Sequence, residues 1–383
     1  MTDTPATLQQ KYGLRRENFI LDPLTDVDCF ARNDIDTREI AESLDIDLVT
    51  GLAPKRLVWG PYGGGKTHTL MRTIRELEQL TPIHAVRIEC PDLSKKSRFH
   101  DLYREGIMRG LGEAFVIGIV EDAVQSVGLA RREELVRKLV DRFRDQEVAK
   151  AAIRIIDPNF DSLRLWRWLA GVSMSRQDLD DLGQTQDLTQ AEAARLAEVI
   201  VMLGRLLREL KKKTLVLVLD EMERLHSIGP DTITTFVSGF TRLVDPNQTS
   251  VSVLIGASAQ VQTEMVEVFS FGSNNPVTSR IGPDSQIEIE ALSDPDVDAF
   301  ITGIIAYVRD RNADLPGLVR RAQAGGEETV SERFFPFTNE AIEALKSQLT
   351  TLMTPREITM KMTRSLGRAH RNGKIVISSG CIV

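Results

Sequence analysis

Residues 56–70 read RLVWGPYGGGKTHTL and place a glycine-rich loop between two segments of different character. The four residues before the loop form a short, mostly apolar run that is typical of a strand. After the loop, apolar side chains recur at helical spacing, namely Leu70, Ile74, Leu77 and Leu80. The sequence therefore predicts a strand, a glycine loop and a helix, in that order.

The loop matches the P-loop pattern, in which four residues separate Gly60 from Gly65-Lys66-Thr67. Glycines allow backbone N–H groups to converge on phosphate oxygens at the start of the following helix. Lys66 is expected to reach the β- and γ-phosphates, and the Thr67 hydroxyl to bind Mg²⁺. A turn that merely joins strand to helix is the alternative, but strand, loop, Lys-Thr pair and helix all agree in order. We expect ATP and Mg²⁺ as cofactors, with the nucleotide bound by Gly60, Gly63, Gly64, Gly65, Lys66, Thr67 and His68.

A second motif, TLVLVLDEMERL at residues 214–225, ends an apolar run in two acidic residues. Such a run is typical of a strand buried on both faces, and parallel sheets bind ligands at the carboxyl ends of their strands. Asp220 is expected to bind the Mg²⁺, directly or through water, and Glu221 to orient and polarise the attacking water. By itself an acidic pair after a strand more often marks a turn or a helix start. With the P-loop upstream, it indicates an ATPase.

The composition narrows the functional classes. A formal net charge of −7 argues against a chain that coats nucleic acid through its bulk charge, although a local basic face remains open. The three cysteines are far apart and form no C-x-x-C pair, which predicts a reducing compartment and no structural zinc. The N-terminus is polar and no apolar run approaches 18 residues, so we expect a cytoplasmic protein with no membrane span.

The rest of the chain alternates strand and helix patterns, which predicts a parallel sheet with helices on both faces. Further strands are expected at residues 83–90, 250–258 and 285–292, and helices at 36–44, 231–244 and 260–269. Between the second strand and the Asp220 strand, helical patterns at 98–128, 131–156, 162–171 and 189–212 predict an insertion. The expected domains are an arm (1–50), a nucleotide-binding core (51–292) with the helical insertion (93–212), a helical lid domain (293–371) and a tail (372–383) with a β-like KIVISS segment.

These motifs resemble the AAA+ ATPases, and within them the branch of origin-recognition-type initiators and related bacterial P-loop ATPases. The resemblance extends from about residue 50 to residue 370 and implies a five-stranded parallel sheet with a helical lid. It also implies that Ser258, at the end of an extra strand between the two motif strands, is a polar sensor. Arg280 in TSRIGP resembles the arginine finger that acts on a neighbouring subunit, and Arg356 in TPREI resembles the arginine that senses the γ-phosphate in cis. Surface salt bridges are the alternative for both arginines.

A narrower resemblance involves LRLWRWLAG at residues 163–171, followed by a long helix and then the LVLVLDEMERL strand. This order is similar to that in the ATP-binding proteins of BREX-type phage-defence islands, and it implies that Glu223 is the second acidic residue of a D-E-x-E pattern. Two observations oppose the resemblance. No winged-helix DNA-binding tail is recognised, and tryptophans on a helix are more often core residues.

Basic and metal-ligating residues add little further chemistry. The five histidines have no ligand spacing, so no metal beyond Mg²⁺ is expected. Residues 95–98, Lys-Lys-Ser-Arg, follow the second core strand and are a candidate DNA contact. Three lysines at residues 211–213 are better explained as a solvated helix end.

The sequence thus predicts an ATPase that assembles with itself into a ring or filament and couples nucleotide state to a DNA-related process. Phage defence is the first context; regulation of DNA transposition, or loading of a DNA-acting factor, is the second. Candidate partners are further copies of the chain, double-stranded DNA, and defence or transposition proteins. A slow nucleotide-gated switch or scaffold is the alternative from another class, and DNA stimulation of hydrolysis separates the two. A small-molecule kinase is disfavoured by the sensor and lid arginines.

Overall fold

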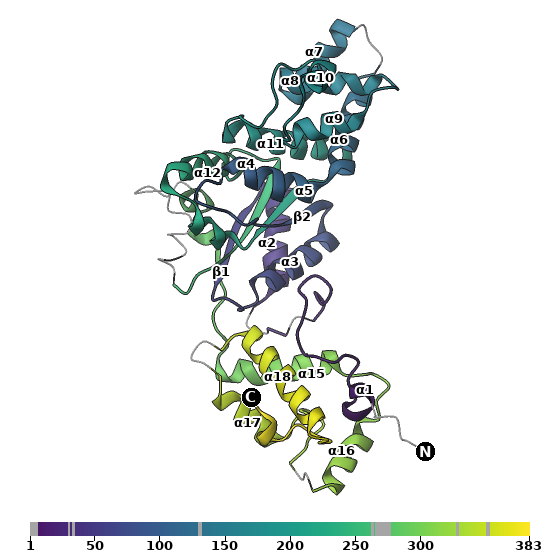
Figure 1. Cartoon of the computed structure of the whole chain (residues 1–383), viewed down its shortest axis with the longest axis vertical. Coiled ribbons are helices and arrows are strands. Elements are labelled where there is room, and N and C mark those ends of the chain that lie inside the picture. Colours follow the sequence, from purple (N-terminus) through teal and green to yellow (C-terminus); the bar gives the residue numbers. More distant parts are fainter. Residues whose placement is uncertain are drawn as a thin grey trace. The chain divides into compact units, whose positions relative to one another are not determined.

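The computed structural model describes the chain except for residues 1–6, 30, 33–34, 129–131, 262–263, 265–276, 327–328 and 350–352. The chain divides into two compact units (Figure 1). The lid unit comprises Met1–Arg38, Gly60–Arg75 and Ile289–Val383, and the sheet unit comprises Glu39–Trp59 and Glu76–Glu288. The expected helix at 260–269 lies largely outside the described residues.

Five strands form one sheet in the order β2-β3-β4-β1-β5. Their bounds are Lys55–Gly60 (β1), Ile83–Glu89 (β2), Thr214–Asp220 (β3), Val251–Ser258 (β4) and Gln286–Glu288 (β5). The pairs β2–β3, β3–β4 and β1–β5 are parallel. The predicted five-stranded parallel sheet flanked by helices is therefore confirmed.

β5 is shorter than the strand expected at 285–292. After Glu288 the backbone leaves the ladder, and the Leu292 N–H donates to the Met353 carbonyl (2.8 Å) within the lid unit. The apolar alternation of this segment therefore reflects burial beside the lid helices as well as strand pairing.

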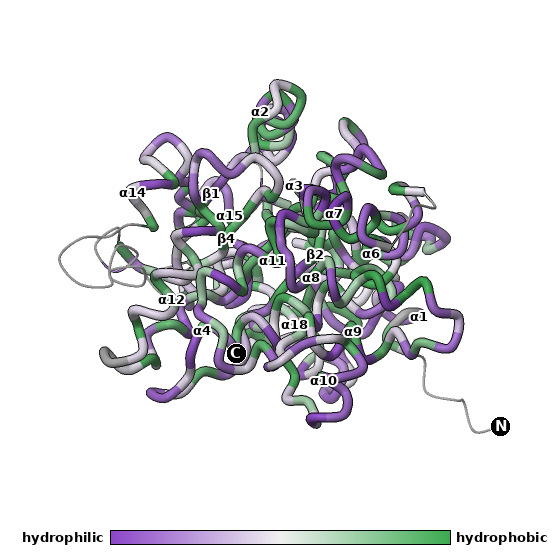
Figure 2. Tube along the Cα trace, turned by 90° about the horizontal axis from the view of Figure 1, so that it is seen from above, coloured by the Kyte–Doolittle hydropathy of each residue, from purple (hydrophilic) through white to green (hydrophobic). Residues whose placement is uncertain are grey.

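The core of the sheet unit is built around β3. All seven of its residues are buried, as expected from its uninterrupted apolar run. Helices α11 (Ala193–Lys211) and α12 (Pro230–Leu243) pack near it, and α11 contributes an apolar face that includes Leu196, Ile200, Leu203 and Leu207. Figure 2 shows both hydrophobic and hydrophilic residues along most helices, the pattern expected where one face is buried.

The insertion is helical, as expected, but more divided. Its elements are α4 (Phe99–Asp101), a π-helical turn η1 (Leu102–Met108), α5 (Arg109–Leu111), α6 (Glu113–Ser126), α7 (Arg132–Phe143), α8 (Gln146–Ala152), η2 (Ile153–Ile156), α9 (Ser162–Leu169) and α10 (Arg176–Leu182). The expected helix at 98–128 is interrupted at Gly112, whose φ of 77° favours glycine. Trp168 on α9 is buried, and its Nε1 donates to the Gln186 carbonyl (3.2 Å), so it is a core residue.

The lid unit contains α1 (Leu8–Tyr12), the first residues of α3 (Lys66–Leu80), α15 (Asp294–Val308), α16 (Leu315–Ala324), α17 (Asn339–Ser347) and α18 (Pro355–Arg371). Tyr12, Leu14 and Phe19 of the arm are buried in the same core as α15, α17 and α18. Helix α2 (Thr37–Val49) lies mainly in the sheet unit.

The expected β-like tail is not a strand. Its Ile377 makes one isolated bridge with Phe337, and a short turn, η5 (Ser379–Cys381), follows. The KIVISS segment is apolar because Val376 and Ile377 are core residues. In the described part of the chain, no helix has both the length and the hydrophobicity of a membrane span.

Candidate nucleotide site

The glycine loop lies between β1 and α3 and has the backbone of a P-loop. Gly63 and Gly65 have φ values of 78° and 103°, which side-chain-bearing residues rarely adopt. Lys66 is 8% exposed, and its Nζ donates to the carbonyl oxygens of Gly60 (3.2 Å) and Pro61 (2.9 Å). The lysine side chain therefore reaches back along the loop.

Arg356, near the start of α18, lies against this loop within the lid unit. Its backbone N–H donates to the Gly63 carbonyl (3.2 Å), and its Nη1 donates to the Tyr62 hydroxyl (2.6 Å). The guanidinium also lies 4.8 Å from the centre of the Tyr62 ring. A Cβ on Gly63 would come within 2.8 Å of the Arg356 Cβ, so this close approach requires glycine. The structure thus brings together Tyr62 and Arg356, which are 294 positions apart in the sequence.

Arg32 also contacts the loop, and no sequence pattern pointed to this residue. Its side chain is 4% exposed, and Nη1 donates to the carbonyl oxygens of Gly64 and Glu290, both at 2.9 Å. An arginine in an irregular arm belongs to no motif, and its partners are backbone atoms of distant residues. Only the folded structure identifies it.

Two further residues of the expected nucleotide set lie in the first turn of α3. Thr67 and His68 are both partly buried. Burial lowers the pKa of His68, while backbone hydrogen bonds to Val27 and Asp26 act in the opposite direction. His68 thus joins the helix to the arm of the lid unit, and this contact gives it a structural role.

In the sheet unit, Asp220 ends β3 with a buried carboxylate. Its Oδ2 accepts hydrogen bonds from Arg87 Nη2 (2.8 Å) and Nε (3.2 Å), and its Oδ1 accepts one from the Glu221 N–H (3.1 Å). The register pairs Glu89 of β2 with Asp220. Arg87 lies two residues before Glu89 on the same strand, so both side chains are on the same face of the sheet. Sequence reasoning missed Arg87, although a charged residue near the end of an otherwise apolar strand was the available signal.

Glu221 has a left-handed backbone (φ 58°), an uncommon conformation for a residue with a side chain. Its carboxylate forms an ion pair with Arg224 in the following turn, η3 (Met222–Ser227). Burial raises the pKa of Glu221, and Arg224 acts to lower it. Arg224 also donates to the Cys90 carbonyl (2.6 Å) and to Glu89 (3.1 Å), so it links this turn to β2.

The remaining sequence candidates of the sheet unit are Ser258, Glu223 and Arg280, and they lie in two separate parts of it. The Ser258 N–H, at the end of β4, donates to Glu223 Oε2 (2.9 Å), so the structure joins two sequence candidates. Arg280 is an exposed residue of a short helix, α14 (Thr278–Ile281), and its Nη1 donates to the Thr241 carbonyl (3.2 Å). Among the described residues of the sheet unit, Arg280 forms no hydrogen bond or ion pair with Asp220, Glu221 or Ser258.

These features define the class of fold: an α/β core with a five-stranded parallel sheet flanked by helices and a glycine loop after its first strand, together with a helical domain. In such a parallel sheet, the carboxyl ends of β1 and β3 lie at the same edge. In the lid unit, the glycine loop and Lys66 suit phosphate oxygens, and the Thr67 hydroxyl suits a hydrated Mg²⁺. In the sheet unit, the Asp220 carboxylate is also the kind of ligand that Mg²⁺ prefers. Among the described residues, no three histidine, cysteine or carboxylate side chains form a denser metal cluster.

Comparisons with known proteins give distant structural similarities. No protein-family model matches the chain, and no curated protein matches it. Solved structures that are similar include the ORC1 protein of Aeropyrum pernix in complex with DNA, at 15% identity and a TM-score of 0.47, covering 96% of this chain and 67% of that one. Drosophila ORC bound to DNA is 12% identical with a TM-score of 0.44, covering 100% and 67%. A Walker-type ATPase of Pyrococcus abyssi is 16% identical with a TM-score of 0.38, covering 93% and 72%. The chain thus spans about two thirds of the length of these structures.

Proposed function

We propose that this chain is an ATPase that binds Mg-ATP and hydrolyses it to ADP and phosphate. The observation that carries the proposal is the glycine loop of the lid unit, which Lys66 and Arg356 both contact. A strand-to-helix turn with no ligand would not require a buried lysine and two arginines around a run of glycines. A phosphate-binding loop, in contrast, requires cations and backbone N–H groups that can come close to the phosphate oxygens.

The roles of the site residues follow from their chemistry. The loop N–H groups and Lys66 hold the phosphates, and Thr67 and Asp220 hold Mg²⁺, which when bound neutralises charge on the phosphates. Glu221 polarises the attacking water after its carboxylate leaves Arg224. Ser258 positions that water, and Arg356 contacts the γ-phosphate from the same chain. Arg280 acts on the nucleotide of a neighbouring copy, so the working form is a homo-oligomer, as a ring or filament.

We further propose that hydrolysis is coupled to an act on DNA, with phage defence as the first biological context. The support is the sequence resemblance to BREX-type proteins and an exposed basic turn in the sheet unit. Lys95, Lys96 and Arg98 are all exposed there. The Lys95 carbonyl accepts hydrogen bonds from Gly229 (3.2 Å) and Thr232 (3.1 Å), which fix the turn against the start of α12. The alternative contexts, regulation of DNA transposition and loading of a DNA-acting factor, would use the same binding and hydrolysis of ATP.

The experiment is ATP turnover measured with and without double-stranded DNA. We expect DNA to raise turnover of the wild type, and the double variant Lys95→Ala, Lys96→Ala to lose that response. The control, Lys212→Ala with Lys213→Ala, removes the same charge from the end of α11 and should keep it. Slow turnover that is indifferent to DNA would instead support the nucleotide-gated switch.

A further inference from the structure

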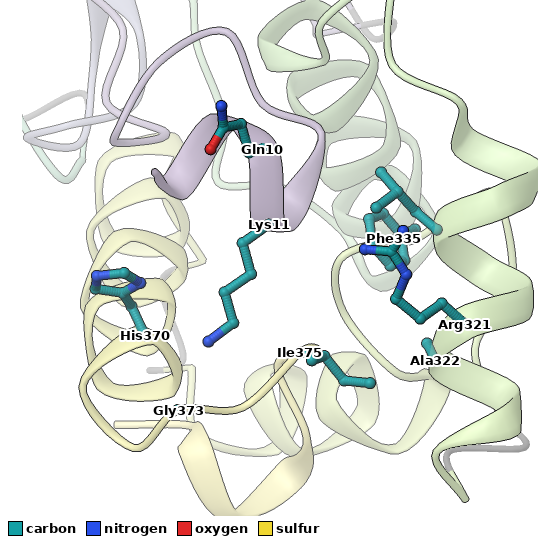
Figure 3. Close-up of a pocket in the computed structure, with 9 residues that line it drawn as sticks. Gln10, Lys11, Arg321, Ala322, Phe335, His370, Gly373 and Ile375 are labelled. Carbon is teal, nitrogen blue, oxygen red and sulfur yellow. The ribbon is translucent and has the colours of Figure 1, made fainter. Parts of the chain in front are cut away.

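A cavity lies in the lid unit, and its lining residues are not part of the glycine loop. It has a volume of about 560 Å³ and lies among α1, α16, the end of α18 and the segments around Phe335 and Ile375 (Figure 3). Pockets that bind small molecules and cofactors usually have volumes of about 300–1,000 Å³. The cavity is therefore large enough for a ligand rather than for a few waters only.

Three basic side chains from three helices line this cavity: Lys11 of α1, Arg321 of α16 and His370 of α18. Figure 3 shows Lys11 extending from α1 into the space between His370 and Arg321. No carboxylate is among the described lining residues, and no hydrogen bond or ion pair joins these three side chains to a described residue. With no counterion among the described lining residues, the permanent charges of Lys11 and Arg321 create a positive potential, which an anion would relieve.

The same cavity has an apolar wall. Leu318, Ala322, Phe335 and Ile375 contribute to it, and Phe335 is buried in a small core with Val319, Val330 and Val376. Ile375 is one of the exposed large hydrophobic residues of the described chain, at 36%. A simple inorganic anion would not cover this apolar wall, which would stay exposed to water. The wall and the basic groups together fit a ligand that has both a charged end and a flat apolar part.

We propose that this cavity binds a small nucleoside phosphate, at a site separate from the glycine loop. Its phosphate group lies among Lys11, Arg321 and His370, whose side chains line the cavity from different sides, since guanidinium and ammonium groups are the usual partners of phosphate oxygens. Its base lies on the apolar wall, and the Gln10 side chain, also in the lining, supplies an amide that can donate to or accept from ring heteroatoms. A cavity suits a small ligand better than the continuous backbone of a nucleic acid. This inference does not depend on the proposed ATPase activity.

The test is calorimetric titration of the full chain carrying Lys66→Ala, which removes the loop lysine and so separates the two sites. The probes are the monophosphates AMP, GMP, CMP and UMP, with pyrophosphate and the unphosphorylated nucleosides for comparison. We expect at least one monophosphate to bind, and its nucleoside and pyrophosphate to bind roughly tenfold more weakly or worse. Adding Lys11→Ala or Arg321→Ala should weaken the monophosphate roughly tenfold.

The control variants are Arg320→Ala and Arg371→Ala, which remove exposed arginines next to the lining residues in sequence but outside the cavity. They should leave the affinity unchanged, and equal melting temperatures will show that all variants are folded. The proposal is overturned if no monophosphate binds, if pyrophosphate binds as tightly as the monophosphates, or if binding survives both Lys11→Ala and Arg321→Ala. Binding of a DNA duplex through these residues, without binding of any monophosphate, would assign the surface to nucleic acid instead.

Discussion

Two arginines from opposite ends of the chain contact adjacent glycines of one loop. Arg32 donates to the Gly64 carbonyl (2.9 Å), and the Arg356 N–H donates to the Gly63 carbonyl (3.2 Å). Both contacts use carbonyl oxygens, so they hold the loop without occupying its amide donors. A phosphate-binding loop benefits from this arrangement because its donors are already positioned when the ligand arrives.

Arg32→Ala tests this support. The variant loses two hydrogen bonds from a charged, buried donor, a contact that typically stabilises by about 1.5–3 kcal/mol. We expect a lower melting temperature and weaker ATP binding, measured by thermal unfolding and by titration of Mg-ATP. Arg311→Ala, which removes an exposed arginine of the same unit, is the control. Unchanged stability and affinity in Arg32→Ala would contradict the supporting role.

At the scale of helices and strands, α11 packs closely at Gly204 against the first residue of β4. A Cβ at Gly204 of α11 would lie 2.5 Å from Val251 Cγ2 and 2.6 Å from the Ser250 carbonyl oxygen. Gly204→Ala should therefore destabilise the protein, because overpacking costs about 1–3 kcal/mol and exceeds the gain in helix propensity. Gly118→Ala in α6 is the matched control: its Cβ would meet no atom within 4 Å, so we expect stabilisation of about 0.5–1 kcal/mol. Chemical denaturation measures both, and stabilisation by both substitutions would show that α11 can move away from β4.

Elements with a strong pattern could be predicted from the sequence, whereas those that depend on contacts could not. The apolar run of β3 and the glycine loop determine their own structure, and both were predicted. Helix α10 was missed because its sequence, RQDLDDL, is short and largely polar. Arg32 and Arg87 could not be identified because their partners, the Gly64 carbonyl and Asp220, become neighbours only in the fold.

At the scale of the whole molecule, the proposed action of Arg280 on a neighbouring copy would make one chain insufficient for hydrolysis. Its exposed position on α14 suits a residue that acts on a neighbouring copy. If it does, turnover per subunit should rise with protein concentration, and Arg280→Ala should lose about 10³-fold or more in rate while it keeps its own ATP binding. Arg176→Ala, another exposed arginine of the sheet unit, should retain activity.

Mixing two inactive variants gives the stricter test of this assembly. Arg280→Ala keeps an intact nucleotide loop, and Lys66→Ala keeps an intact arginine, so some turnover should return where the two subunits meet. If the mixture stays inactive and turnover of the wild type is independent of concentration, Arg280 is a surface arginine and the monomer is the working unit.

We propose that this chain hydrolyses ATP with Glu221 as the residue that activates water. Phosphate release from Mg-ATP by the wild type and by Glu221→Gln, side by side, tests it most directly. The variant has no charge with which to polarise water but retains Asp220, so it should bind ATP and release phosphate at least about 10²-fold more slowly. Equal rates of phosphate release in the two proteins, or no release by the wild type under any condition, would contradict the claim.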